Sequence, residues 1–446
     1  MSSGRAVGGC RLFPMRLVRF LAIGLLGLGG SLASTHADPS VVKVVKGADG
    51  TFQLLRNGHP FFIKGAGGND HLDLLQQAGG NSLRTWGIET LGEGAPGPTV
   101  LEQAEKLDLA VTAGIWLQHA PGFDYADPKQ LEAQRQQVRD AVTRYKDSPA
   151  LLIWGLGNEM EGTTSDGDNP ALWQEINYLA GMIKQLDPNH PVMTVLAGAG
   201  AVKVHSVAQY CPNIDILGIN AYGSAPGVGK AVTQAGWDRP FLLTEFGPLG
   251  QWEVSQTPWG APIEPTSTEK AASYYATEKN LTADFPKTCL GTYAFLWGNK
   301  QEATATWYGM FLPDGSKVGP VDAISFAWTG QWPDKRCPLI RALPVDLTGK
   351  QLAAGSDVPV QIIATDPNPN SGPLQYQWEL MAESTVHGIG GSFEATPQTL
   401  AAAVTPGADG SAIVHVPAQK GAYRLFVYVR NAYQAAATAN MPFQAN

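Results

Sequence analysis

The stretch LLIWGLGNE, residues 151–159, is an apolar run that ends in an amide next to a carboxylate. Continuous apolar runs of this length are typical of strands that are buried on both faces, as in parallel sheets. A second run, FLLTEFG (241–247), also carries a glutamate, Glu245, near its end. We therefore expect Glu159 and Glu245 to lie at the carboxyl ends of two strands of one sheet.

Similar short runs recur between about Phe52 and Trp332, separated by longer amphipathic or polar segments. This alternation predicts βα units, and eight strands in about 280 residues predict a (β/α)8, or TIM, barrel. The runs are FFIKGAGG (61–68), NSLRTWG (81–87), AVTAGIWLQH (110–119), LLIWGLGNE (151–159), VMTVLAG (192–198), IDILGINAYG (214–223), FLLTEFG (241–247) and GTYAFLWGN (291–299).

Two of the intervening segments, Pro128 to Lys146 and Pro170 to Leu186, carry apolar residues at helical spacing and predict outer helices. Before the barrel, the turn residues Asn57 and Gly58 stand between two apolar arms, which predicts a hairpin. Residues 38–336 are accordingly predicted to form the barrel with an N-terminal hairpin.

Beyond Cys337 the composition shifts to Val, Ala, Thr, Pro and Gly, with alternating segments such as DVPVQIIA (357–364) and YRLFVYVR (423–430). This pattern predicts an Ig-like or PKD-like β-sandwich over residues 337–446, an accessory domain for positioning or glycan adhesion. Asp366 lies in a segment similar to the loops of PKD-like and cadherin-like modules. An ordinary turn is favoured there over a calcium site, because few carboxylates lie near it.

The first residues have the features of a secretory signal peptide, residues 1–37. Four arginines, of which Arg5 is the first, precede or open the apolar run from Leu17 to Leu32. Small residues follow at Thr35 and Ala37, which predicts cleavage after Ala37. The alternative is an uncleaved membrane anchor, but the run is shorter than the roughly 20 residues that a span needs and glycines interrupt it. We expect export to the periplasm or the medium, without stable membrane insertion after cleavage.

Cleavage would leave 27 basic and 39 acidic residues, a net charge near −12, so nucleic acid is not an expected partner. Three cysteines would remain, Cys211, Cys289 and Cys337, which permits one disulfide and one free thiol. Their spacing does not match a zinc site, and we expect neither a metal nor a cofactor. We also expect a monomer.

Polar and aromatic side chains follow several predicted strands, at the face of a barrel where working residues gather. The candidates for the site are Arg84, Trp86, His119, Asn158, Glu159, Asn220, Tyr222, Glu245, Trp297 and, slightly later, Trp307.

Two carboxylates with amide, guanidinium, phenol and indole groups suit hydrolysis of a glycosidic bond with retention of configuration. One glutamate must donate a proton to the leaving oxygen, and the other must attack the anomeric carbon. Asn158 could hold the sugar 2-hydroxyl, while Arg84 and Tyr222 could keep Glu245 ionised. Trp297 and Trp307 could stack on a sugar ring, and His119 could contact it.

The same motifs resemble the barrel of glycoside hydrolase clan A. NSLRTWG, WGLGNEM, INAYG and LLTEFG are closest to the family 2 catalytic barrel, and FFIKG and GNE are also similar to the family 72 β-1,3-glucanosyltransferases. The resemblance covers about Phe52 to Pro333. It implies that Glu159 is the acid/base after strand four and Glu245 the nucleophile after strand seven. Asn220-Ala221-Tyr222 stands where family 5 enzymes usually have His-x-Tyr.

These observations predict a β-glycosidase for oligosaccharides or polysaccharides, with neutral β-glucan ahead of β-mannan or β-galactoside. A transglycosylase would use the same glycosyl-enzyme intermediate, with a sugar hydroxyl in place of water. A carbohydrate-binding protein without turnover is the alternative from another class.

Overall fold

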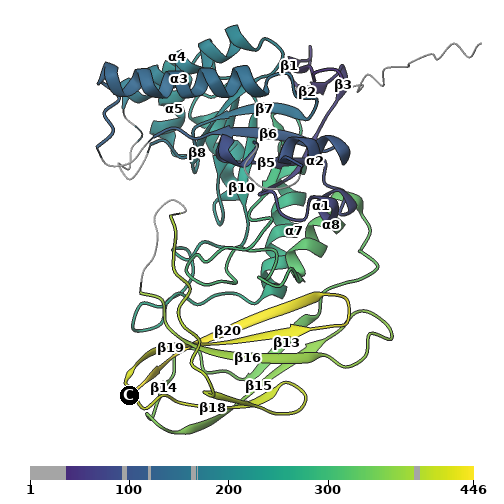
Figure 1. The fold of residues 1–446 in the computed structure, drawn as a ribbon, viewed down its shortest axis with the longest axis vertical. Helices are drawn as coiled ribbons and strands as arrows, with labels where there is room; N and C mark the ends of the chain where they lie inside the picture. Colours follow the sequence, from purple (N-terminus) through teal and green to yellow (C-terminus); the bar gives the residue numbers. More distant parts are fainter. Residues whose placement is uncertain (1–36, 93–97, 119–121, 162–166, 168, 386–391) are drawn as a thin grey trace, which may run out of the picture. The chain divides into compact units, whose positions relative to one another are not determined.

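The computed structural model describes residues 37–92, 98–118, 122–161, 167, 169–385 and 392–446 (Figure 1). The predicted signal peptide, apart from Ala37, and the candidate His119 lie outside this part of the chain. Within it, no helix combines the length and the apolar character that crossing a membrane requires.

Eight parallel strands close into a barrel, which confirms the predicted fold class. Each strand consists almost entirely of buried residues, which explains why it reads as an apolar run. In chain order the strands are β4 (Ile63–Gly67), β5 (Ser82–Arg84), β6 (Ala110–Ile115), β7 (Leu151–Leu156), β8 (Val192–Ala197), β9 (Ile216–Asn220), β10 (Phe241–Phe246) and β11 (Cys289–Ala294), and β11 closes the barrel onto β4.

Helices connect the strands and cover the barrel. The two predicted outer helices are present as α3 (Pro128–Tyr145) and α4 (Pro170–Leu186), each with proline at its first position. The side chains of Asp127 and Asn169 cap them by accepting a backbone N–H. The other helices are α1 (Leu72–Gln77), α2 (Val100–Lys106), α5 (Ala201–Tyr210), α6 (Val228–Gln234), α7 (Ser267–Asp284) and α8 (Gly319–Thr329), with short 3-10 turns at Ile88–Thr90 and Ala225–Gly227.

The predicted hairpin belongs to a three-stranded sheet of β1 (Val42–Lys46), β2 (Phe52–Arg56) and β3 (His59–Pro60). Asn57 and Gly58 form its turn with φ values of 53° and 82°, which asparagine and glycine tolerate best. Val42 and Leu54 pack on residues at the strand starts of the barrel. The sheet therefore closes the N-terminal end of the barrel and leaves the opposite end for the site.

A buried cluster fastens the chain just before this sheet. Ser40 Oγ donates to Leu151 O at 2.6 Å and lies 2.9 Å from His190 Nε2, while His190 Nδ1 lies 2.8 Å from Asp187 Oδ2. Ser40 and His190 are buried, so this serine, histidine and aspartate serve packing and do not form an accessible nucleophilic triad.

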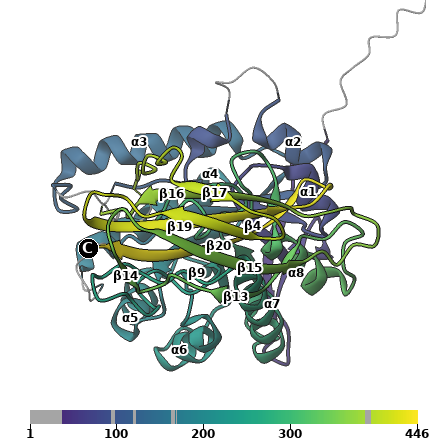
Figure 2. The ribbon, with the colours of Figure 1, turned by 90° about the horizontal axis from the view of Figure 1, so that it is seen from below.

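The C-terminal residues form the predicted sandwich, whose two sheets pack face to face (Figures 1 and 2). One sheet contains β13 (Leu339–Val345), β15 (Asp357–Thr365), β18 (Ser411–His415) and β17 (Val404–Pro406). The other contains β12 (Lys317–Val318), β20 (Ala435–Ala445), β19 (Gly421–Arg430) and β16 (Gln375–Ala382), with β14 (Gln351–Leu352) also on β20. Asp366 accepts the backbone N–H of Asn368 at 2.9 Å, as in a turn.

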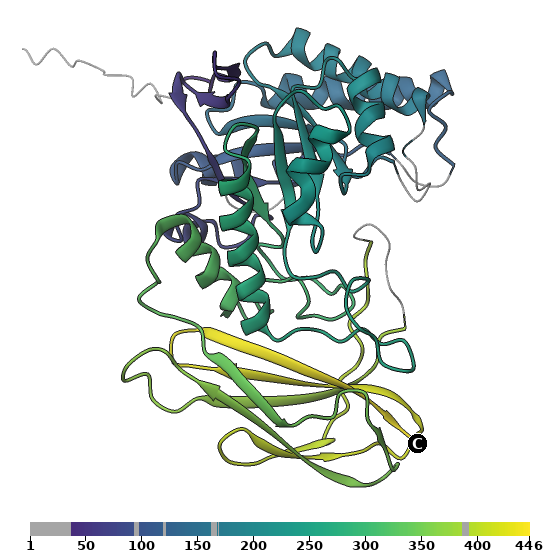
Figure 3. The same cartoon turned by 180° about the vertical axis from the view of Figure 1, so that it is seen from behind.

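The barrel and the sandwich are joined within one compact unit, Asp38–Asn446. β12 precedes α8 of the barrel but pairs in parallel with β20 of the sandwich. Helix α7 reaches from the barrel to β13 and β20 (Figure 3). The predicted boundary after residue 336 falls in the connection between α8 and β13.

The three cysteines of the described chain, Cys211, Cys289 and Cys337, are buried free thiols. The disulfide that their number permits is therefore not formed.

Candidate active site

Glu159 follows β7 through a tight turn at the open end of the barrel. Gly157 and Glu159 both have left-handed backbone conformations, with φ values of 73° and 50°. For a glutamate this conformation is strained, and it persists only where the surroundings hold it. The hydrogen bond from Glu159 N to Val195 O, 3.0 Å, provides one such constraint on the backbone that carries the carboxyl group.

Glu245 is the fifth residue of β10, and its carboxylate receives three donors. Arg84 Nη1 and Trp86 Nε1 donate to Oε1 at 3.0 and 2.8 Å, and Tyr222 OH donates to Oε2 at 3.0 Å. Burial raises the pKa of Tyr222 well above its ordinary value, so its hydroxyl keeps the proton that it donates. One ion pair and two further hydrogen bonds therefore fix the position of the Glu245 carboxylate.

Two asparagines link the glutamates. Asn158 Oδ1 accepts from Arg84 Nη2 at 2.7 Å, and Asn220 Nδ2 donates to Glu159 Oε1 at 2.7 Å. Thr244 Oγ1 donates to Asn220 Oδ1 at 2.8 Å, which fixes the orientation of that amide. Sequence reasoning missed Thr244, because a threonine inside a strand carries no signal of such a role.

The environment of Glu159 favours the neutral acid. Burial and, to a smaller extent, the Glu245 carboxylate raise its pKa from 4.5 to about 7, while the hydrogen bond from Asn220 opposes both effects. Glu159 is thus suited to hold a proton near neutral pH, next to a second carboxyl group that forms an ion pair with Arg84. This arrangement is the one that general acid catalysis beside a nucleophile requires.

Both glutamates line a cavity of about 570 Å³ at the carboxyl ends of the strands. Its described lining consists of Trp86, Gly87, Glu89, Thr90, Trp116, Asn158, Glu159, Tyr222, Glu245, Gln251, Trp252, Phe295, Leu296, Lys300 and Glu302. The mixture of apolar rings and a few polar groups is typical of a site for a small organic ligand or a sugar.

Of the three tryptophans at the cavity, the sequence suggested Trp86 but not Trp116 or Trp252. Trp116 follows β6 directly, so the expectation that site residues lie just after the barrel strands could have identified it. Trp252, which is 60% exposed, lies in the loop after β10 and has no local signal. Its ring meets Tyr222 edge-on at 5.7 Å.

Trp297 and Trp307 do not lie at the cavity, contrary to expectation. β11 ends at Ala294, so Phe295 and Leu296 reach the cavity while Trp297 turns into the core, where it packs edge-on against Phe311 at 5.2 Å. Trp307 is also buried, and its Nε1 donates to Leu249 O at 3.0 Å. Neither ring presents a face on which a sugar could stack.

The structure therefore brings most of the sequence-derived candidates together at one end of the barrel. Around Glu159 and Glu245 lie Arg84, Trp86, Asn158, Asn220 and Tyr222. No group of three or more His, Cys, Asp or Glu residues in the described chain could hold a metal ion.

The chain is similar in sequence to known glycoside hydrolases. Residues 104–249, which include Glu159 and Glu245, match the family model described as glycosyl hydrolases family 2, TIM barrel domain. The resemblance of the barrel to clan A is confirmed. The clan A relatives include mannan endo-1,4-β-mannosidase F of Aspergillus clavatus, 25% identical over 245 residues, covering 45% of this chain and 52% of the mannosidase. Another is a β-glucuronidase of Paenibacillus borealis, 26% identical over 268 residues, covering 51% of this chain and 41% of the glucuronidase.

Among solved structures, a family 2 β-galacturonidase from Eisenbergiella tayi is 16% identical, with a TM-score of 0.48, covering 66% of this chain and 54% of that chain. This chain spans about half the length of the curated relatives that it matches.

Proposed function

We propose that this chain is a retaining β-glycosidase that hydrolyses neutral β-linked glycans with Glu159 as acid/base and Glu245 as nucleophile. The observation that carries the proposal is the unequal environment of the two carboxyl groups. The pKa of Glu159 is raised to about 7 by burial and by Glu245, whereas Glu245 accepts from Arg84, Trp86 and Tyr222.

The reaction would proceed in two displacements. Glu245 attacks the anomeric carbon as the glycosidic C–O bond breaks, and Glu159 gives its proton to the departing oxygen. Glu159, now ionised, takes a proton from water, whose oxygen attacks the same carbon and releases Glu245. Asn158 Nδ2 has no hydrogen-bond partner within the described residues, so it is available to the sugar 2-hydroxyl next to the reacting carbon.

The charges of the cavity favour a neutral sugar over a uronate. Lys300 is the one cation among the described residues that line it, and its Nζ lies 2.7 Å from Glu302 Oε2. Arg84 is likewise committed to Glu245. A substrate carboxylate would therefore meet Glu89 and the two proposed catalytic glutamates without an uncommitted cation to balance its charge.

From the sequence we expect β-glucan to be preferred among neutral glycans, and the similarity to mannan endo-1,4-β-mannosidase F adds β-mannan as a candidate. The test is turnover by the purified protein on β-glucans, β-mannans, β-galactosides and aryl β-glycosides, with aryl glucuronides included. The configuration of the first product is followed by proton NMR. We expect a β product from neutral substrates and none from glucuronides.

Glu245→Ala should abolish turnover, while Glu105→Ala, on the exposed side of α2, is the control for loss of a carboxylate. An α product would contradict retention, and preference for the glucuronide would contradict the charge argument. Products longer than the donor would assign the chain to transglycosylation, and binding without turnover would assign it to the carbohydrate-binding proteins.

We further propose that the protein is exported, with cleavage after Ala37, and acts as a monomer. N-terminal sequencing of the secreted protein and light scattering of the purified protein test these two points. A mature protein that begins before residue 37, or a stable dimer, would contradict them.

A further inference from the structure

One wall of the cavity is formed by residues 299–308, here called the 299–308 loop, which follows β11. Lys300 and Glu302 of this loop line the cavity. At the end of the loop, Tyr308 OH donates to Gln251, another lining residue, and the Tyr308 ring lies 5.4 Å from that of Tyr222. The position of the loop therefore determines the shape of this side of the cavity.

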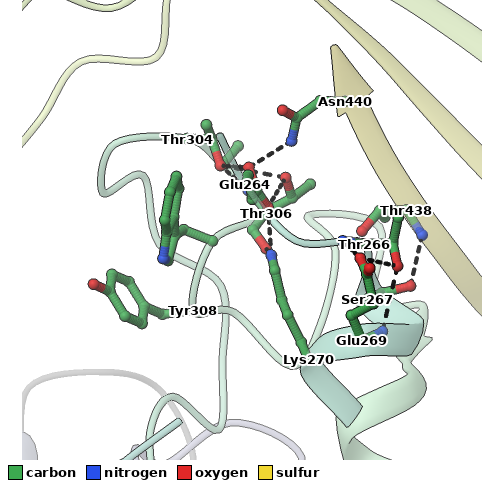
Figure 4. A network of polar contacts seen from close by, with 12 residues as sticks. Glu264, Thr266, Ser267, Glu269, Lys270, Thr304, Thr306, Tyr308, Thr438 and Asn440 are labelled. Carbon is green, nitrogen blue, oxygen red and sulfur yellow. Dashed lines mark hydrogen bonds and ion pairs between the residues drawn. The ribbon is translucent and has the colours of Figure 1, made fainter. Parts of the chain in front are cut away.

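The loop is held from behind by a buried carboxylate, Glu264 (Figure 4). Thr304 Oγ1 donates to Glu264 Oε2 at 2.6 Å, and Thr306 Oγ1 donates to Oε1 at 2.8 Å. Lys270 forms an ion pair with Glu264 and donates to Thr306 O at 2.6 Å. A buried ion pair of this kind is stable only when its remaining hydrogen-bonding capacity is satisfied.

The sandwich supplies part of that requirement. Asn440 of β20 donates through Nδ2 to Glu264 Oε2 at 2.5 Å (Figure 4). Its Oδ1 accepts from Arg424 Nη1 of β19 at 2.6 Å. Arg424 is 2% exposed, and its Nη2 donates to Pro262 O at 2.8 Å. A continuous chain of hydrogen bonds thus runs from the sandwich to the loop that borders the cavity.

A second residue of the sandwich reaches the loop at a different point. Glu394, between β16 and β17, is 3% exposed and accepts the backbone N–H of Ala303 through Oε2 at 2.8 Å. Ala303 is the residue next to Glu302. The loop is consequently anchored to the sandwich on both sides of Thr304.

We propose that the sandwich is part of the substrate-binding site, with Asn440 and Glu394 as positioning residues that hold the 299–308 loop against the cavity. A ten-residue loop with no helix or long strand loses much conformational entropy when it is fixed in one place. Contacts that order the loop before the substrate binds remove this cost from the binding step and so increase the affinity for the substrate. The effect on activity rests on the proposed function, whereas the ordering of the loop does not.

The test compares variants of the full chain in two assays. Asn440→Leu and Glu394→Ala remove the two anchors. Glu394→Gln is the conservative variant, because its amide oxygen can still accept from Ala303 N. The matched control is Ser267→Ala, which removes the hydrogen bond from Thr438 N to Ser267 Oγ, 2.8 Å, at the same barrel–sandwich contact but removes no hydrogen bond to the loop.

We expect KM for oligosaccharides to rise about tenfold in Asn440→Leu and Glu394→Ala, the factor that corresponds to about 1.4 kcal/mol, with kcat changed by less than about twofold. Hydrogen exchange of the amides in residues 299–308 should accelerate in the same two variants. Glu394→Gln should restore most of the wild-type values, and Ser267→Ala should keep them.

Equal effects in Ser267→Ala would show that general loosening of the sandwich is responsible and would overturn the proposal, as would unchanged loop exchange in both anchor variants. If Asn440→Leu does not fold, the comparison of Glu394→Ala with Glu394→Gln tests the proposal, together with Thr306→Val, which removes the hydrogen bond from Thr306 Oγ1 to Glu264. If the wild-type protein turns over no substrate, the proposed function fails, while the exchange comparison still tests the positioning.

Discussion

The raised pKa of Glu159 predicts that the residue destabilises the fold when it is ionised. We expect Glu159→Gln to be more stable than the wild-type protein at pH 8 but not at pH 4. Glutamine has nearly the same shape, and its amide oxygen can still accept the hydrogen bond from Asn220 Nδ2 that Glu159 Oε1 accepts at 2.7 Å. The substitution therefore removes the charge and leaves the packing in place.

The sign and size follow from the two pKa values. The pKa of Glu159 is 4.5 in the unfolded chain and about 7 in the folded one. Below pH 4.5 the group is neutral in both states and costs nothing. As the pH rises from 4.5 to 7, the unfolded chain loses the proton first, so the folded state loses relative stability. Above pH 7 the group is ionised in both states, and the free energy of unfolding is lower by about 3 kcal/mol, at about 1.4 kcal/mol per unit of pKa difference.

The assay is chemical unfolding of both proteins at pH 4, 6 and 8, with Glu105→Gln on the exposed side of α2 as the control for net charge. The advantage of Glu159→Gln should grow with pH and reach about 3 kcal/mol at pH 8. A constant difference across this range would refute the raised pKa. The same group should set the basic limb of kcat/KM, with activity on natural glycans falling as pH rises through about 7.

Four further predictions concern single substitutions. Glu245→Ala should lose turnover of every substrate and regain it with azide, giving an inverted product. Glu159→Ala should keep activity only on dinitrophenyl glycosides, and its azide product should be retained; the opposite stereochemistry in the two variants would exchange the roles. Trp252→Ala should raise KM about fivefold, as loss of about 1 kcal/mol of stacking implies, and an unchanged KM would remove Trp252 from the substrate path. Ser40→Ala should lower the free energy of unfolding by about 1 to 3 kcal/mol, because His190 and Leu151 O lose a buried partner; an unchanged denaturation midpoint would contradict this.

The barrel was predictable because its strands are buried on both faces and are therefore continuous apolar runs. The helices α3 and α4 were predictable from their spacing and their first-position prolines. Strand β20, in contrast, was missed: its sequence AAATANMPFQA has weak strand propensity, and pairing with β19 along ten residues makes it a strand. Long-range pairing of this kind leaves no local trace in the sequence.

The polar centre of the candidate site was predictable because strand ends meet at one face of a barrel. The aromatic surroundings were not. In GTYAFLWGN the apolar character continues beyond Ala294, so the sequence does not reveal where the chain leaves the strand, and Trp297 was assigned to the cavity in place of Phe295. The loop residues Gln251 and Trp252 reach the cavity only through tertiary folding.

The pairing of β12 with β20 determines which residues must be included if the sandwich is transferred to another protein. Lys317 and Val318 pair with Ala435 and Ala436, so the first part of β20 depends on residues that precede the last barrel helix. A chimeric protein that carried only residues 337–446 on another barrel would expose the backbone N–H and C=O groups of this strand. Bare sheet edges of that kind recruit other chains and aggregate. Exchange of the module between hydrolases would therefore require residues 317–446, helix α8 included.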